Sequence, residues 1–157
     1  MSRLVLASGS RWRHQLLDRL GIPYTWSNPN IDESAQPGES PSALVHRLAL
    51  AKAACLADDY PAHLIIGSDQ VAVCEGEILG KPGSISAAQA QLARFSQRRV
   101  SFLTGLALID TANNRHWVGH ERYDVIFRQL TETEIAHYVE RERPLDCAGS
   151  FRMEGLG

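Results

Sequence analysis

The segment from Ser8 to Arg13 is the first whose residue types and spacing favour a chemical role, namely the binding of an anion. A short apolar run, Arg3–Ala7, predicts a buried strand that enters the small-residue turn Ser8-Gly9-Ser10 and opens a helix. The free N–H groups and dipole of a helix start attract phosphate, a Ser8 hydroxyl donates, and an Arg13 guanidinium grips two oxygens. Taken alone, a plain capped helix with a solvent-facing arginine explains this segment better, because such turns are common.

Two acidic residues and a lysine form the second candidate group. Asp32 and Glu33 lie in a polar loop, and Lys52 follows among alanines on a predicted helix. Acidic loop residues usually face water, and a lysine among small apolar residues can extend its ammonium group to solvent. These residues therefore indicate a charged site only in combination with the other motifs.

The third group is Gly67-Ser68-Asp69-Gln70, which follows the apolar run Leu64–Ile66. An acidic group at the end of a strand lies where α/β proteins commonly bind ligands, whereas a turn-forming aspartate is the plain alternative. The apolar pattern resumes at Val71–Val73. Asp69 and Gln70 would then lie inside a strand, where a polar pair demands an explanation.

Two glycine-containing segments complete the candidate site. Gly80-Lys81-Pro82 forms either a simple turn or a loop that presents Lys81 to a phosphate. The segment 148–157 contains Glu154 and three glycines, which permit close backbone approach to a ligand, although a flexible terminus explains it equally well. The sequence contains no His-Glu-x-x-His motif, P-loop or Gly-x-Gly-x-x-Gly fingerprint, which disfavours a histidine metal site.

Hydrophobic periodicity predicts an α/β fold with a mixed sheet that positions these residues. Leu44, Leu48, Ala51 and Cys55 define the expected apolar face of the second helix, and Glu75-Gly76 predicts a hairpin turn. The expected strands are Arg3–Ala7, Pro23–Ser27, Leu64–Val73, Ile78–Leu79, Val100–Ile109 and Trp117–Phe127. The expected helices run from Ser10 to Gly21, from Ser40 or Ser42 to about Asp58, from Ile85 to Ser96, and from Thr131 to Glu140.

Composition excludes several classes of protein. The 157 residues fit one globular domain, and the formal net charge of −2 argues against a broad basic surface for a nucleic-acid polymer. The apolar runs are too short to span a bilayer or to form a signal peptide. Three cysteines without a Cys-x-x-Cys motif indicate neither a disulfide framework nor a zinc site, and a cytoplasmic location is the default expectation.

The order and spacing of these segments together resemble the Maf family of nucleotide pyrophosphatases. The resemblance implies a single domain over residues 1–157, with an elongated mixed sheet flanked by helices, an inosine triphosphate pyrophosphatase-like fold and an active site in a central cleft. The matching pieces are Leu6–Ser10 with Arg13, Asp32-Glu33, Lys52-Ala53, Gly67-Ser68-Asp69, Gly80-Lys81-Pro82 and Gly149-Ser150-Phe151.

Three positions resemble the YceF subgroup of this family, whose preferred substrate is 7-methyl-GTP. Trp12, Gln70 and Glu154 stand where the subgroup that prefers dTTP and UTP typically carries Arg, Thr and Gln. Methylation at N7 makes guanine cationic, and a cation over a Trp face gains about 0.5–2 kcal/mol. Glu154 would accept hydrogen bonds from the two N–H donors of the guanine edge. A core aromatic on the first helix is the alternative for Trp12.

The resemblance also implies a reaction, in which water attacks the α-phosphorus and releases pyrophosphate. Asp69 is expected to act as general base or to orient the water, while Arg13, Lys52 and Lys81 neutralise phosphate oxygens. Glu33 and Asp69 are expected to hold a divalent cation, Mg²⁺ or Mn²⁺. Two alternatives remain open: the same chemistry on dTTP, UTP or another modified nucleotide, and a weakly catalytic nucleotide-binding regulator of cell division.

Family members continue beyond the glycine-rich stretch with a further strand and helix. We therefore expect a C-terminal segment beyond Gly157 that this sequence lacks; a truncated protein is the alternative, and truncation would weaken a base pocket near Glu154. A nucleoside triphosphate is the expected partner, with neither a nucleic-acid polymer nor a membrane. A homodimer is common in the family, and the sequence leaves the oligomeric state open.

Overall fold

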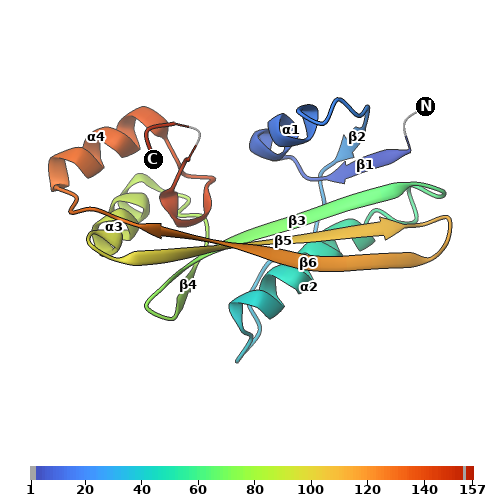
Figure 1. Ribbon diagram of the computed structural model, residues 1–157, viewed down its shortest axis with the longest axis horizontal. Helices are drawn as coiled ribbons and strands as arrows, with labels where there is room; N and C mark the ends of the chain where they lie inside the picture. Colours follow the sequence, from blue (N-terminus) through green and yellow to red (C-terminus); the bar gives the residue numbers. More distant parts are fainter. Residues whose placement is uncertain (1–2, 154) are drawn as a thin grey trace. The chain divides into compact units, whose positions relative to one another are not determined.

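The computed structural model describes residues 3–153 and 155–157, so the expected base reader Glu154 lies outside the described residues (Figure 1). Helices and strands are interspersed along the chain, which confirms the predicted α/β class. The elements are β1 (Leu4–Ala7), α1 (Arg11–Asp18), β2 (Thr25–Ser27), α2 (Pro41–Ala54), β3 (Leu64–Cys74), β4 (Glu77–Leu79), α3 (Ile85–Phe95), β5 (Arg99–Asp110), β6 (Arg115–Ile126), α4 (Glu132–Glu142) and the 3₁₀ turn η1 (Ala148–Ser150).

The strands of the described chain form one mixed sheet with the order β2-β1-β3-β5-β6, and β4 also pairs with β3. β1 pairs in parallel with β2 and with β3, while β4 is antiparallel to β3. The β3–β4 hairpin turns at Glu75 and Gly76, which both have positive φ, and this confirms the predicted turn. In Figure 1 the neighbouring strands β5 and β6 run in opposite directions.

The chain divides into two compact units. The first unit comprises residues 1–69 and 104–121, and the second comprises residues 70–103 and 122–157. β3, β5 and β6 each contribute residues to both units, and the division in β3 falls between Asp69 and Gln70. The expected elongated shape and central cleft stay predictions.

Helix α2 belongs to the first unit, and its buried face differs from the predicted one. Ser40 caps the helix by accepting a hydrogen bond from the Ala43 amide, as one of the two expected starts requires. The predicted face through Ala51 and Cys55 is wrong, because Cys55 is exposed. The buried residues are Leu44, Val45, Leu48, Ala49, Lys52 and Ala53.

Two glycines bring the α2 backbone into close contact with the sheet. A Cβ on Gly67 in β3 would lie 2.1 Å from the Ala49 carbonyl oxygen. A Cβ on Gly105 in β5 would lie 2.3 Å from the Val45 carbonyl oxygen. Only glycine fits such an approach, so these positions fix the distance between α2 and the strands that carry part of the site.

The second unit has its own core of α3, α4 and strand residues, which includes Phe95, Phe102 and Val139. Helix α4 begins with the predicted cap, a reciprocal capping box between Thr131 and Glu134. No helix in the described part of the chain is long and apolar enough to span a membrane.

The start of the first unit differs from expectation in two details. Ser10 occupies the N-cap position of α1, but its side chain makes no capping hydrogen bond. Leu16, Leu17 and Leu20 recur at helical spacing, which predicts one apolar face, but Leu17 is buried whereas Leu16 and Leu20 are exposed. Helix α1 therefore packs through a narrow contact and leaves much of its surface open.

Candidate functional site

A buried lysine between two carboxylates forms the centre of the site in the first unit. The Lys52 Nζ lies 2.7 Å from Asp69 Oδ1 and 3.0 Å from Glu33 Oε2. The Lys52 side chain is 4% exposed and that of Asp69 8%, whereas the Glu33 side chain is 48% exposed. Lysine is almost never this buried without a partner, and the pair of carboxylates supplies one.

The strand register explains where Asp69 lies. Ala7, the last residue of β1, pairs with Gly67, so β3 continues past the carboxyl end of its parallel neighbour. Asp69 is therefore inside β3, and the interpretation that places it at the end of its own strand is wrong. It nevertheless lies just beyond the carboxyl end of β1, where α/β sheets commonly bind ligands.

Side-chain alternation along β3 then directs Asp69 toward α2. Gly67 and Asp69 are two residues apart and share one face of the strand, and Gly67 packs directly against the backbone of α2. Lys52 lies one helical turn beyond Leu48 on the buried face of that helix. Close packing at Gly67 thus brings the Lys52 ammonium to the Asp69 carboxylate.

The Ser8 turn at the end of β1 is fixed by several hydrogen bonds. Ser8 Oγ accepts from the Ser10 amide at 3.1 Å and from Arg13 Nη1 at 3.2 Å. His14 Nε2 lies 3.1 Å from the Ser8 carbonyl oxygen. Among the described residues no acceptor takes the Ser8 hydroxyl proton, so this buried hydroxyl retains a donor for a phosphate oxygen.

Arg13 is electrostatically coupled to the two carboxylates. Burial lowers the pKa of Arg13, while the charges of Asp69 and Glu33 act in the opposite direction. A guanidinium stays protonated in either case, so Arg13 provides a permanent positive charge. Arg13 and Lys52 oppose Asp69 and Glu33, and the group is neutral as a whole.

The carboxylates of Asp69 and Glu33 supply oxygen atoms of the type that a divalent cation prefers as ligands. Mg²⁺ prefers oxygen ligands and is usually bound by one or two carboxylates together with water and phosphates. Lys52 occupies Oδ1 of Asp69, and Oδ2 makes no hydrogen bond with any described residue. Within residues 3–153 and 155–157, no group of three or more His, Cys, Asp or Glu side chains is placed to hold a metal ion.

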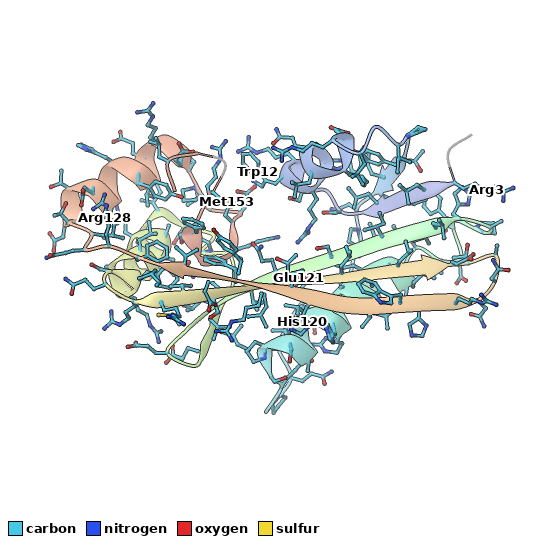
Figure 2. All side chains as sticks on the ribbon, in the orientation of Figure 1. Arg3, Trp12, His120, Glu121, Arg128 and Met153 are labelled. Carbon is cyan, nitrogen blue, oxygen red and sulfur yellow. The ribbon has the colours of Figure 1, made fainter. Side chains whose placement is uncertain are left out.

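Two of the three expected base-reading residues lie in the described chain. Trp12 projects from α1 (Figure 2) and is half-buried rather than a core residue. The Arg11 guanidinium carbon lies 4.2 Å from the centre of its ring, so the indole already accepts a cation. Gln70 is an exposed residue of β3 and belongs to the second unit.

In the second unit the structure joins two further predicted motifs, Gly80-Lys81-Pro82 and the segment around Ser150. The Gly80 carbonyl oxygen accepts from the Gly149 amide at 3.1 Å and from Gln91 Nε2 at 3.3 Å. Lys81 is exposed. The sequence did not predict Gln91, or His14 in the first unit, as part of the site, because neither residue belongs to a motif or breaks a pattern.

A serine turn after a parallel strand, an adjacent arginine and a buried lysine–aspartate pair are features that α/β proteins use to bind phosphate groups. The chain matches the model of Maf-like proteins over residues 3–157 and belongs to this family. This match covers both compact units.

Several similar proteins carry the name 7-methyl-GTP pyrophosphatase, and three of them illustrate the range of identity. The protein from Chromohalobacter salexigens is 71% identical over the whole chain and 81% of its own length. The one from Pseudomonas aeruginosa is 54% identical over the whole chain and 82% of its length. The one from Alcanivorax borkumensis is 53% identical over 98% of the chain and 78% of its length.

Proposed function

We propose that this chain is a nucleoside triphosphate pyrophosphatase that hydrolyses 7-methyl-GTP to 7-methyl-GMP and pyrophosphate. The observation that carries the proposal is the buried Lys52–Asp69 pair beside the Ser8 turn and Arg13. The substrate named for the relatives supports the choice of nucleotide.

In the proposed reaction, Asp69 accepts a proton from water as the water oxygen attacks the α-phosphorus. Lys52 holds Oδ1 at 2.7 Å and so orients the carboxylate, which leaves Oδ2 for the water. The new bond joins water oxygen to the α-phosphorus, and the bond from that phosphorus to the bridging oxygen breaks. Pyrophosphate leaves with the electron pair, and Arg13 and Lys52 stabilise the charge that develops.

The residues that would hold Mg²⁺ or Mn²⁺ are Asp69 and Glu33. A bound divalent cation supplies positive charge to the phosphate oxygens and polarises them. Glu33 suits this role because its side chain is half-exposed and only its Oε2 is engaged by Lys52.

Recognition of the methylated base is assigned to Trp12, Gln70 and Glu154, and Lys81 is assigned to the phosphates. A cationic base that stacks on Trp12 must use the ring face opposite Arg11 or displace that guanidinium. Cation–π attraction of about 0.5–2 kcal/mol gives a preference over GTP of roughly two- to thirtyfold.

Pyrophosphate release from 7-methyl-GTP, GTP, UTP and dTTP in Mg²⁺ tests the proposal. We expect the highest kcat/KM for 7-methyl-GTP, and a loss of at least about a hundredfold in Asp69→Asn with folding retained. Asp58→Asn is the matched control, because Asp58 is an exposed aspartate that follows α2. Nucleotide binding without turnover by the wild-type protein would instead identify a regulator, and faster cleavage of UTP or dTTP would reassign the substrate.

A further inference from the structure

The side-chain amide of Gln91 connects the two motif segments of the second unit. From helix α3, its Nε2 donates to the Gly80 carbonyl oxygen at 3.3 Å. Its Oε1 accepts from the Ser150 hydroxyl at 2.6 Å. Ser150 is completely buried and has a φ of 54°, so this hydroxyl has a fixed position.

Both hydrogen bonds require an amide at position 91. A carbonyl such as that of Gly80 can only accept, so it needs the Nε2 donor, while the Ser150 hydroxyl needs the Oε1 acceptor. Glutamine provides a donor and an acceptor in one plane. A carboxylate would keep the Ser150 contact and place an oxygen against the Gly80 carbonyl.

The Gly80 carbonyl belongs to the peptide unit that leads into Lys81. Holding this carbonyl therefore sets the direction in which the backbone enters Lys81. Lys81 is exposed and makes no hydrogen bond or ion pair to any residue in the described part of the chain. Its direction thus depends on the anchored backbone, where Gly149 and Gln91 share the Gly80 oxygen and Gly83 donates to the Leu145 carbonyl at 3.0 Å.

We propose that Gln91 is a positioning residue for Lys81, holding the Gly80–Lys81 peptide against Ser150 so that the lysine meets the phosphates of the substrate. The inference rests on the proposed function, in which Lys81 binds phosphate. It adds a residue outside the glycine motifs and assigns Ser150 the task of orienting the amide.

Gln91→Glu is the test variant, and Gln89→Glu on the same helix is the matched control. The Gln89 side chain makes no hydrogen bond to another described residue, and its substitution introduces the same charge. We expect kcat/KM for 7-methyl-GTP to fall roughly ten- to a hundredfold in Gln91→Glu, because small misplacements of a positioned group have effects of this size. The control should stay within about twofold of wild type.

The variant Lys81→Ala distinguishes an effect of Gln91 that acts through Lys81 from a general disturbance of the structure. If Gln91 acts through Lys81, then Gln91→Glu lowers activity by less than about twofold when Lys81 is already alanine. A purely structural role gives losses that multiply, and multiplication overturns the inference, as does equal activity of Gln91→Glu and Gln89→Glu.

Binding of inorganic tripolyphosphate by calorimetry provides a readout that needs no turnover. The inference is supported if Gln91→Glu weakens tripolyphosphate binding as much as Lys81→Ala does. This holds even if the wild-type protein releases no pyrophosphate, a result that would refute only the proposed function. If Lys81→Ala changes neither tripolyphosphate binding nor turnover, then Lys81 does not bind phosphate and the inference is refuted.

Discussion

Replacement of Lys52 by methionine is predicted to destabilise the fold as well as to abolish catalysis. Methionine retains most of the apolar length but removes the ammonium that faces Asp69 at 2.7 Å. Asp69 then remains as a carboxylate only 8% exposed, and removal of one partner of a buried ion pair costs about 3–5 kcal/mol. Because half-exposed Glu33 is released to solvent, we expect the lower end, about 3 kcal/mol.

Equilibrium urea unfolding measures this loss directly, and thermal unfolding should show a decrease in Tm of roughly 6–12 °C for a chain of this size. The double variant Lys52→Met/Asp69→Asn removes both charges and should recover most of the lost stability, since a buried pair can be replaced at little cost. Lys81→Met is the control. Lys81 is the only other lysine in the sequence, and because it is exposed its replacement should change stability by less than about 0.5 kcal/mol.

Two results would refute the reasoning about Lys52. A single variant within about 1 kcal/mol of wild type would mean that Asp69 reaches solvent or another cation without Lys52. A double variant as unstable as the single one would mean that the lost packing of the lysine stem, rather than the uncompensated carboxylate, causes the effect. Activity does not distinguish these cases, because both variants should be inactive.

Three further predictions concern the support of the site, its acid stability and its metal. Gly67→Ala places a methyl group 2.1 Å from the Ala49 carbonyl oxygen, so it should cost about 1–3 kcal/mol in thermal unfolding and lower kcat by displacing α2. The hydrogen bond from Arg47 holds the pKa of Glu39 at about 2, below its ordinary 4.5, so the stability this carboxylate contributes is complete above pH 4.5 and lost as pH falls toward 2. The free energy of unfolding in urea should therefore change less between pH 7 and pH 3 in Glu39→Gln than in the wild-type protein. Chelation by EDTA should stop pyrophosphate release, with recovery on addition of Mg²⁺ or Mn²⁺ and little change in Tm, and unchanged turnover in EDTA would remove the metal from the proposal.

The burial of Lys52 shows where sequence reasoning about the site reaches its limit. The position follows Leu44 and Leu48 at intervals of four, so periodicity alone includes it in the buried face of α2. The predicted face ran instead through Ala51 and Cys55. The ammonium charge of Lys52 is tolerated at this buried position because Asp69, from strand β3, pairs with it. A pattern within one helix cannot reveal a partner on another element.

The glycines also differ in whether a local sequence pattern predicts their role. Gly76 lies in a turn with positive φ, and its pairing with Glu75 was recognisable as a hairpin signal. Gly67 and Gly105 have no such local signature, because their role is to let the backbone of α2 approach. The alternation of strands and helices was therefore predictable from local patterns, whereas the packing distances that place the site residues arise only in the tertiary structure.

Charge balance in the first unit bears on how substrate and metal enter the proposed reaction. Arg13 and Lys52 are opposed by Asp69 and Glu33, so before a ligand arrives the group offers a phosphate no net attraction. A multiply charged triphosphate that approaches alone meets two carboxylates as well as two cations. A divalent cation held by Asp69 and Glu33 would reverse this, because it would supply positive charge that attracts the phosphates. In the proposed reaction, the two carboxylates that face Lys52 would therefore also make binding of the nucleotide depend on a divalent cation.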